Sequence, residues 1–249
     1  MNCTVLKIIL KSNIDFLLFL ILFINLSCRQ KITDEKDFVI YITNPQKQNV
    51  RFYWKGNNGA FKNIESLKKR LESENQNLLF AMNGGMFDND NSPKGLYIEN
   101  SKILKNIDTL TGNGNFYLQP NGIFYLTKSG ESNIIETKKY KQTPQTIFAT
   151  QSGPMLLIDG GEINPIFQQE SNNLNIRNGV GILQNGELIF AMSKAEINFY
   201  NFAKLFKEYG CKKALYLDGF VSRVYAPSKK REQIDGDFGV IIGISESKK

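Results

Sequence analysis

The sequence predicts a single folded domain of the α/β or α+β class, with a mixed β-sheet core, several hairpins and flanking helices. Short apolar runs recur from residue 38 onward and are separated by Gly, Pro and Asn, which is typical of strands and turns. Residues 61–74 and 198–209 instead carry apolar side chains at helical spacing. The 249 residues, of which 41% are hydrophobic, suffice for one sizeable core but not for two domains by default.

The first elements follow from local patterns. Residues 38–42 and 50–54 are apolar and end at turn signals, which predicts two strands. Residues 61–74 place Ile64, Leu67 and Leu71 on one face with charged residues between them, so this segment should be an amphipathic helix. The continuous apolar run at 78–82 predicts a buried strand.

Turn residues in the middle of the chain predict a series of hairpins. The predicted pairs are 96–98 with 102–104, 116–118 with 123–126, 155–158 with the chain beyond its Asp-Gly-Gly turn, and 180–183 with 188–192. Asn185-Gly186 joins the last pair, and Asn-Gly is the strongest short hairpin signal.

The last third of the chain predicts a strand, a helix and a strand. Asn198 can cap a helix that runs to Tyr209 and stops at Gly210. The apolar segments 214–217 and 238–244 are then expected to be buried strands. This order predicts a crossover connection that returns the chain to the same sheet.

Composition excludes several kinds of chemistry. The chain has no histidine, so a Ser-His-Asp triad and a His-containing zinc site are excluded. Its three cysteines, two of them near the N-terminus, predict neither a disulfide framework nor a multi-cysteine zinc site. The net charge of +7 is carried by scattered basic residues with no nucleic-acid-binding motif, and we expect no nucleic-acid partner.

The N-terminus predicts export. Residues 1–27 combine basic residues with an apolar run too short to span a membrane, as in a signal peptide. Leu26-Ser27-Cys28 resembles a bacterial lipobox, so we expect Cys28 to be lipidated and to anchor the protein in the cell envelope, periplasmic or outer-surface. Residues 28–37 would be a tether, and 38–249 the folded domain. A plain secretory signal or an uncleaved anchor is the alternative.

Polar clusters follow several of the predicted buried strands, where side chains can converge on a cleft. The singled-out residues are Asn83, Gly84 and Gly85; Lys94 and Glu99; Gln151 and Ser152; Arg177; and Asp218, Ser222 and Arg223. Arg177 is the best anion-binding candidate because a guanidinium matches phosphate oxygens in pairs. A carboxylate such as Asp218, at the end of a strand and beside a glycine, is a frequent catalytic placement. Each of three residues also has a purely structural alternative: a tight turn for Asn83, an exposed surface position for Arg177 and an Asx turn for Asp218.

Taken in order, five segments resemble the phosphodiester glycosidase family. They are 80–87 (Phe-Ala-Met-Asn-Gly-Gly-Met-Phe), 93–100 (Pro-Lys-Gly-Leu-Tyr-Ile-Glu-Asn), 151–157 (Gln-Ser-Gly-Pro-Met-Leu-Leu), 177–181 (Arg-Asn-Gly-Val-Gly) and 215–219 (Leu-Tyr-Leu-Asp-Gly). The resemblance extends from about Asn77 to Ile244 and is closest to small, exported bacterial members. In one departure, Phe220 and Val221 stand where many relatives have further glycines before a serine.

The resemblance implies hydrolysis of a sugar-1-phosphodiester in an envelope or extracellular glycan. Arg177 and the N–H groups of Gly84 and Gly85 would bind the phosphate, and Asp218 would be the nucleophile or the base that activates water. The other residues would contact substrate: Asn83, Gln151 and Ser152 through sugar hydroxyls or phosphate oxygens, Lys94 through an anion, Glu99 as a second carboxylate, and Ser222 and Arg223 beside the Asp-Gly turn.

Two alternatives come from other classes. One is a non-catalytic envelope lipoprotein that binds glycan or teichoic-type polymers. The other is a metal-dependent phosphodiesterase that uses Asp88, Asp90 and Asp218, although no glycine or glutamate stands at calcium-loop spacing. We expect no cofactor, with a divalent cation left open by this second alternative.

Overall fold

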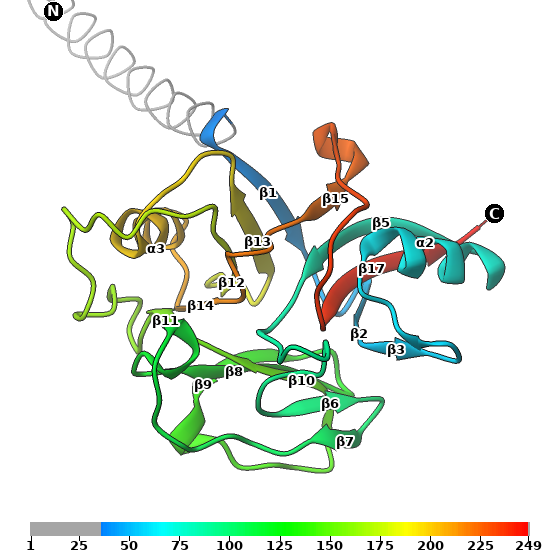
Figure 1. The fold of residues 1–249 in the computed structure, drawn as a ribbon, viewed down its shortest axis with the longest axis horizontal. Helices are drawn as coiled ribbons and strands as arrows, with labels where there is room; N and C mark the ends of the chain where they lie inside the picture. The colour runs from blue at the N-terminus through cyan, green and yellow to red at the C-terminus, as the bar shows by residue number, and fades with distance from the viewer. Residues whose placement is uncertain (1–35, 249) are drawn as a thin grey trace, which may run out of the picture. The chain divides into compact units, whose positions relative to one another are not determined.

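The structure, a computed structural model, describes residues 36–248 (Figure 1). The predicted leader at 1–27, the lipidation site at Cys28 and most of the tether lie outside these residues. Within them, no helix combines the length and the apolar character needed to cross a membrane. Residues from Val39 onward cluster into one unit by their contacts, and this unit holds the sheets and helices described below.

Three five-stranded sheets form the domain. Sheet I has the order β1 (Phe38–Thr43), β13 (Leu188–Ser193), β12 (Asn178–Ile182), β14 (Lys213–Tyr216) and β11 (Met155–Leu157). Sheet II has the order β7 (Lys102–Lys105), β6 (Tyr97–Glu99), β10 (Thr146–Ser152), β8 (Gly122–Thr127) and β9 (Ser132–Glu136). Sheet III has the order β16 (Arg231–Glu232), β15 (Val224–Ala226), β5 (Gln76–Asn83), β17 (Ile241–Ser247) and β2 (Asn49–Tyr53).

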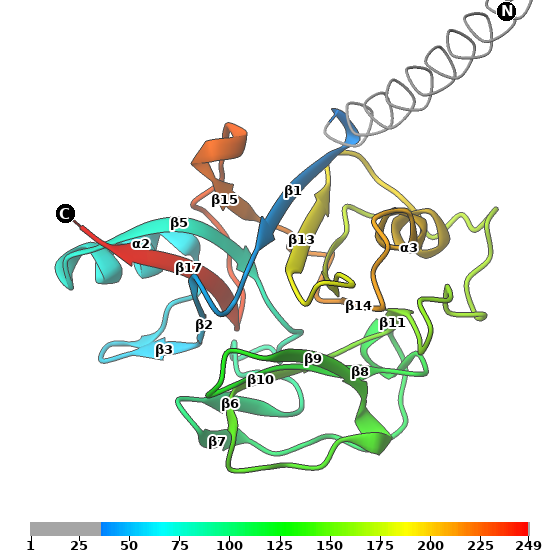
Figure 2. The same cartoon turned by 180° about the vertical axis from the view of Figure 1, so that it is seen from behind.

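Smaller elements complete the chain. They are the hairpin β3 (Lys55–Gly56) and β4 (Gly59–Ala60), and the 3₁₀ turns η1 (Asn115–Tyr117), η2 (Thr137–Lys139) and η3 (Pro227–Lys229). Sheets I and III lie side by side above sheet II in Figure 1, and Figure 2 shows the same order from behind.

Two helices make crossover connections. Helix α3 (Phe199–Glu208) leads from β13 to β14, and both strands pair antiparallel with β12, which lies between them. The crossover predicted for the last third of the chain is therefore confirmed. Helix α2 (Ile64–Ser73) leads into β5, which together with β2 flanks β17 in the same way. The fold is thus an α+β domain of antiparallel sheets with flanking helices, as the sequence predicts.

Asparagine side chains set the start of both helices. The side chain of Asn63 accepts a hydrogen bond from the amide of Ser66 at 2.8 Å, so α2 begins three residues later than the predicted 61–74. Asn198 caps α3 as predicted, accepting from the amide of Asn201 at 2.9 Å. Gly210 follows α3 with a φ of +73°, a conformation that glycine adopts without strain.

One apolar core joins the three sheets. Phe190 of sheet I, Phe124 of sheet II and Phe80 of sheet III are fully buried in it. The Phe190 ring centroid lies 5.1 Å from that of Phe80 and 6.3 Å from that of Phe124. Burying each ring contributes about 1.5–3 kcal/mol, so this core fixes how the strand ends of all three sheets meet.

Two local predictions are wrong. Residues 116–118 do not pair with 123–126, because residues 115–117 form η1 and β8 already has β10 and β9 on its two edges. The side chain of Asn121 donates to the carbonyl of Phe116 at 3.0 Å and closes the turn locally. Gln151 and Ser152, expected among the polar residues that line a cleft, instead end β10 and are fully buried, because both are hydrogen-bonded within the protein.

Candidate functional site

The candidate site lies where strand ends from the three sheets converge. Gly179 pairs with Tyr216, so Asn178 at the start of β12 lies beside Leu217 just after β14. The Leu217 amide donates to the Asn178 carbonyl at 3.1 Å. The end of β10 joins them because the Ser152 hydroxyl donates to the Leu217 carbonyl. The end of β5 joins them through Asn83.

Two buried asparagines hold this convergence together. The side chain of Asn178 donates to the Asn83 side-chain oxygen at 2.9 Å and accepts from the Asp218 amide at 2.8 Å. Asn83 in turn donates to the Asp218 carbonyl at 2.8 Å, and its side-chain oxygen also accepts from the Arg223 amide at 2.9 Å. The network fixes the backbone on both sides of the Asp218 turn. The structure therefore brings Asn83 and the Asp218 turn together through Asn178, and Arg223 joins them by its backbone amide.

The Asp218 carboxyl is the most perturbed acid of the site. Its side chain is partly exposed, yet the surrounding protein desolvates it and raises its pKa from 3.8 to about 7. The Phe220 amide donates to it and opposes part of this shift. A carboxyl that gives and takes a proton near neutral pH is suited to general acid–base chemistry.

Arg177 is a buried cation without a carboxylate partner in the described part of the chain. It is fully buried, and its guanidinium carbon lies 3.6 Å from the centroid of the Phe199 ring. Its Nε donates to the carbonyl of Ile197 at 2.7 Å and its Nη2 to that of Asn173 at 2.8 Å, while Nη1 has no hydrogen-bond acceptor. Burial lowers the pKa of this guanidinium, opposed by Tyr216. Burying a charge without an opposite charge nearby lowers the free energy of unfolding, so such a charge is retained mostly where it serves a function.

Tyr216 connects these two charges. Burial, followed by the charge of Asp218, raises the pKa of its phenol to about 12, whereas Arg177 lowers it. The phenol oxygen accepts from the Gly219 amide at 2.6 Å, and its ring meets Phe199 edge-on at 4.9 Å between centroids. Tyr216 and Asn178 were not singled out from the sequence. Asn178 directly follows Arg177, and Tyr216 lies two residues before Asp218 at the end of a predicted buried strand.

The two glycines after Asn83 serve packing. The Gly84 amide donates to the Val240 carbonyl at 2.7 Å, so it is not a free donor for a phosphate, which corrects the predicted role. A Cβ on Gly84 would lie 2.7 Å from a Val240 methyl, and one on Gly85 would lie 2.3 Å from the Thr150 hydroxyl. Glycine is required here because other strands approach the backbone closely.

The side-chain amide of Gln151 uses its oxygen and its N–H groups in hydrogen bonds within the protein. Its Oε1 accepts from the amides of Leu96 and Asp108, both at 2.9 Å, and its Nε2 donates to the Asp108 carbonyl at 2.6 Å. It therefore has no oxygen or N–H left for a sugar hydroxyl, contrary to the prediction. Ser152 is likewise used, in its bond to Leu217. Both residues act by fixing loops.

Lys94 and Glu99 are held by sheet II and its loops. The Lys94 ammonium lies 4.9 Å from the Tyr117 ring centroid. Glu99 accepts from the Tyr97 hydroxyl at 2.8 Å, and burial raises its pKa. It lines a cavity of about 470 Å³ together with Trp54. These contacts do not involve Asp218, so the predicted roles of Lys94 and Glu99 remain predictions.

Ser222 and Arg223 complete the Asp218 turn. The Ser222 hydroxyl donates to the Gly219 carbonyl at 3.0 Å and is buried. Arg223 is 34% exposed, and its Nε pairs with Asp235 at 2.9 Å. The Arg223 guanidinium is therefore partly accessible to solvent, whereas that of Arg177 is enclosed.

The acidic residues of the metal alternative are engaged in local contacts. Asp88 pairs with Lys105 at 3.5 Å, and Asp90 accepts from the Ser92 amide at 2.9 Å. Among residues 36–248, no three Cys, Asp or Glu side chains are grouped so as to hold a metal ion.

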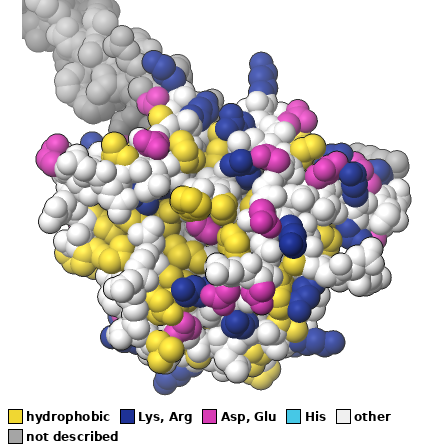
Figure 3. All heavy atoms as spheres, viewed as in Figure 1, with side chains coloured by type: hydrophobic (Ala, Val, Ile, Leu, Met, Phe, Trp, Pro, Cys, Tyr) yellow, Lys and Arg dark blue, Asp and Glu magenta, His cyan; other side chains and the backbone are white. Residues whose placement is uncertain are grey.

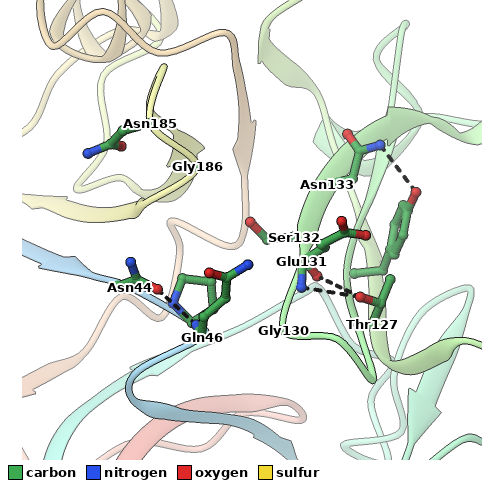
Figure 4. Close-up of a pocket in the computed structure, with 11 residues that line it drawn as sticks. Asn44, Gln46, Thr127, Gly130, Glu131, Ser132, Asn133, Asn185 and Gly186 are labelled. Atoms are coloured by element: carbon green, nitrogen blue, oxygen red, sulfur yellow. Dashed lines mark hydrogen bonds between the residues drawn. The ribbon is translucent and has the colours of Figure 1, made fainter.

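A cavity of about 330 Å³, here called the distal cavity, lies at the other end of β12 (Figure 4). Three turns face one another there: the turn after β1 with Asn44 and Gln46, the turn between β8 and β9 with Glu131, and the turn between β12 and β13 with Asn185. Its walls are mostly amides and hydroxyls, with one carboxylate and no Lys or Arg. It shares no lining residue with the Asp218 turn.

Comparison with known proteins decides the family. The family model for phosphodiester glycosidases matches residues 76–237. The chain belongs to the phosphodiester glycosidase family. The predicted resemblance from Asn77 to Ile244 is thereby confirmed.

Similar proteins come from bacteria and from zebrafish. An uncharacterized protein of Escherichia coli strain K12, YigE, is 38% identical over 187 residues, which is 74% of this chain and 72% of that protein. The catalytic domain of zebrafish N-acetylglucosamine-1-phosphodiester alpha-N-acetylglucosaminidase, auto-inhibited by its pro-peptide, has a TM-score of 0.60 at 18% identity. That match covers 84% of this chain and 82% of the zebrafish chain.

A putative exported protein of Burkholderia pseudomallei K96243 has a TM-score of 0.55 at 10% identity, covering 83% of this chain and 73% of its own. At such identities these two structures show that the phosphodiester glycosidase fold is shared.

Proposed function

We propose that this protein hydrolyses the bond between the anomeric carbon of a sugar and an oxygen of a phosphodiester. The observation that carries the proposal is that two charged groups act on Tyr216 from either side. One is Asp218, whose pKa lies near 7, and the other is the buried Arg177, which has no carboxylate partner in the described residues. Membership of the phosphodiester glycosidase family supports the choice of bond.

In the proposed reaction, water attacks the anomeric carbon while the Asp218 carboxylate takes a proton from it. The bond from the anomeric carbon to the phosphodiester oxygen breaks, and its electron pair leaves with that oxygen. The products are the free sugar and a phosphate monoester, and the proton on Asp218 passes to solvent. A phosphate is a good leaving group, so no strong general acid is needed, which accords with a chain that has no histidine.

Two guanidiniums would stabilise the departing phosphate. Arg177 supplies a fixed positive charge inside the site, because Ile197, Asn173 and Phe199 hold its guanidinium plane. Arg223 has the exposure needed to touch the phosphate itself. Preorganised stabilisation of this kind is typically worth about 3–4 kcal/mol per group.

The direct test is release of reducing sugar from the methyl phosphodiester of α-N-acetylglucosamine-1-phosphate. The wild-type protein should release N-acetylglucosamine, and Asp218→Asn should lower turnover at least about a hundredfold, because the amide cannot accept the proton. Wild-type turnover in purified, folded Asp218→Asn would remove Asp218 from the mechanism. Binding of the probe without sugar release by the wild type would favour the non-catalytic glycan-binding alternative.

We also propose that the substrate is a glycan of the cell envelope and that Cys28 carries a lipid anchor. The basic and apolar leader and the Leu-Ser-Cys sequence at 26–28 support this placement. Cys28→Ser should move the protein from the membrane fraction to the soluble fraction of its host, as measured by immunoblotting. Unchanged membrane association would show that Cys28 is not the anchor.

A further inference from the structure

Phe220 is exposed to an unusual degree. Its side chain is 91% exposed, the largest value among the large apolar side chains of the described residues, and Leu110 follows at 70%. Phe220 lies two residues after Asp218. A large ring in water at this position contributes little to the stability of the fold.

The turn that carries Phe220 is held firmly on both sides of it. Before it, the Gly219 amide donates to the Tyr216 phenol at 2.6 Å and Asn83 donates to the Asp218 carbonyl at 2.8 Å. After it, Val221 packs against the core cluster of α2 and its neighbours, and the Ser222 hydroxyl donates to Gly219. The ring is therefore presented by fixed backbone, whereas Leu110 lies in a segment without helix or strand.

The ring also begins next to the acid–base group. The Phe220 amide donates to the Asp218 carboxyl. Two residues span at most about 7 Å of chain, so the ring is carried by backbone close to the carboxyl that would meet the reacting carbon. Among residues 218–222, Phe220 alone is exposed, because Gly219 is buried and Val221 packs against the core. Protein and membrane contacts use patches of several hundred Å², whereas one ring matches one sugar.

We infer that Phe220 contacts the substrate, its ring stacking on the C–H face of the pyranose whose anomeric carbon faces Asp218. This inference rests on the proposed function and adds the residue that selects the sugar. The electron-rich face of an aromatic ring attracts the slightly positive C–H groups of a pyranose, and a preorganised ring loses little freedom on binding.

The test uses the full-length protein and the methyl phosphodiester of α-N-acetylglucosamine-1-phosphate. Phe220→Ala should raise KM roughly tenfold, the loss expected for one stacking contact, with kcat changed less than about threefold. Phe220→Tyr and Phe220→Trp should restore KM, because each supplies a ring. Leu110→Ala removes another highly exposed apolar side chain, from the segment between β7 and η1, and should leave both constants unchanged.

An unchanged KM in Phe220→Ala, or a faster enzyme, would overturn the inference; the second result would mean that the ring obstructs the site. Calorimetry of the probe with Asp218→Asn and with Asp218→Asn/Phe220→Ala separates this inference from the reaction. Equal Kd values refute stacking even if the wild type is active. A weaker Kd without the ring supports stacking even if the wild type releases no sugar. Absence of binding to both variants also overturns it.

Discussion

The two ends of strand β12 differ in whether their polar groups are buried or face solvent. At its start, Arg177 and Asn178 meet Tyr216 and Asp218 in a network where charges are enclosed and nearly every donor is used. At its far end, the Asn185-Gly186 turn borders the distal cavity, whose amides and hydroxyls face solvent. Figure 4 shows the distal side chains spread over three turns, joined by local hydrogen bonds such as that from Asn133 to Tyr125 at 3.2 Å.

The comparison shows that a cavity alone is a weak indicator of chemistry. The distal cavity has the volume for a sugar, about 330 Å³, but its polar groups are ordinary surface groups that water also satisfies. The Asp218 end holds a desolvated carboxyl and an uncompensated guanidinium, and both cost stability. Charged groups on the outer face shown in Figure 3 are instead of mixed sign and dispersed. Function is therefore better indicated by costly polar burial than by volume.

We expect the largest effect from removing the positive charge of Arg177, at the buried start of β12. Arg177→Gln should lower kcat at least about a hundredfold, because the site loses its fixed positive charge where the phosphate departs. Arg177→Lys keeps the charge but loses the stacked plane on Phe199, and we expect an intermediate loss. Initial rates on the probe, with circular dichroism to verify folding, make the measurement. Equal rates in Arg177→Gln and Arg177→Lys would contradict a role for the charge.

The matched control comes from the distal cavity. Asn133→Ala removes a side chain that lines it and donates to Tyr125, and should leave kcat and KM within about twofold of the wild type. A loss comparable to that of Arg177→Gln would mean that the two ends of β12 do not differ in the way described above.

A smaller effect is expected on stability. Asp218→Asn should lower activity but raise the free energy of unfolding. Folding raises the pKa of Asp218 from 3.8 to about 7, so the folded state binds more protons than the unfolded state in this window and stability falls as pH rises. Asp218→Asn should therefore stabilise the protein at pH 8 by up to about 4 kcal/mol, and much less below pH 4. As a base, ionised Asp218 should make wild-type kcat/KM rise with pH through about 7.

Urea unfolding at pH 5 and pH 8 measures this stability difference. Asp159 supplies the opposite case, because hydrogen bonds from Lys213 and Lys139 lower the pKa of its carboxyl. Asp159→Asn should therefore lower stability at neutral pH by a small amount, as surface pairs are weak. If Asp218→Asn is less stable than the wild type at pH 8, the carboxyl is not desolvated as described.

Much of the fold was predictable because it follows local rules. The alternation at 180–192 with Asn-Gly between its strands gave the β12–β13 hairpin, and Asn198 with Gly210 gave the limits of α3. Prediction failed at β10, where Gln151 and Ser152 are polar by type. Their environment is apolar strand interior only because Leu96, Asp108 and Leu217 supply partners that are distant in sequence.

The sequence by itself determined the family, the periodicity of the strands and helices, and the candidate acid at Asp218, since each rests on residue type and order. Only the tertiary structure decided what these residues do, because desolvation and hydrogen-bond saturation depend on groups far away in the chain. Gly84 and Gln151 became packing and loop-fixing residues, Tyr216 and Asn178 joined the site, and Phe220 was left exposed beside the carboxyl. The burial of these polar groups depends on strands that are distant in sequence, and it decides which of them are structural and which are available for chemistry.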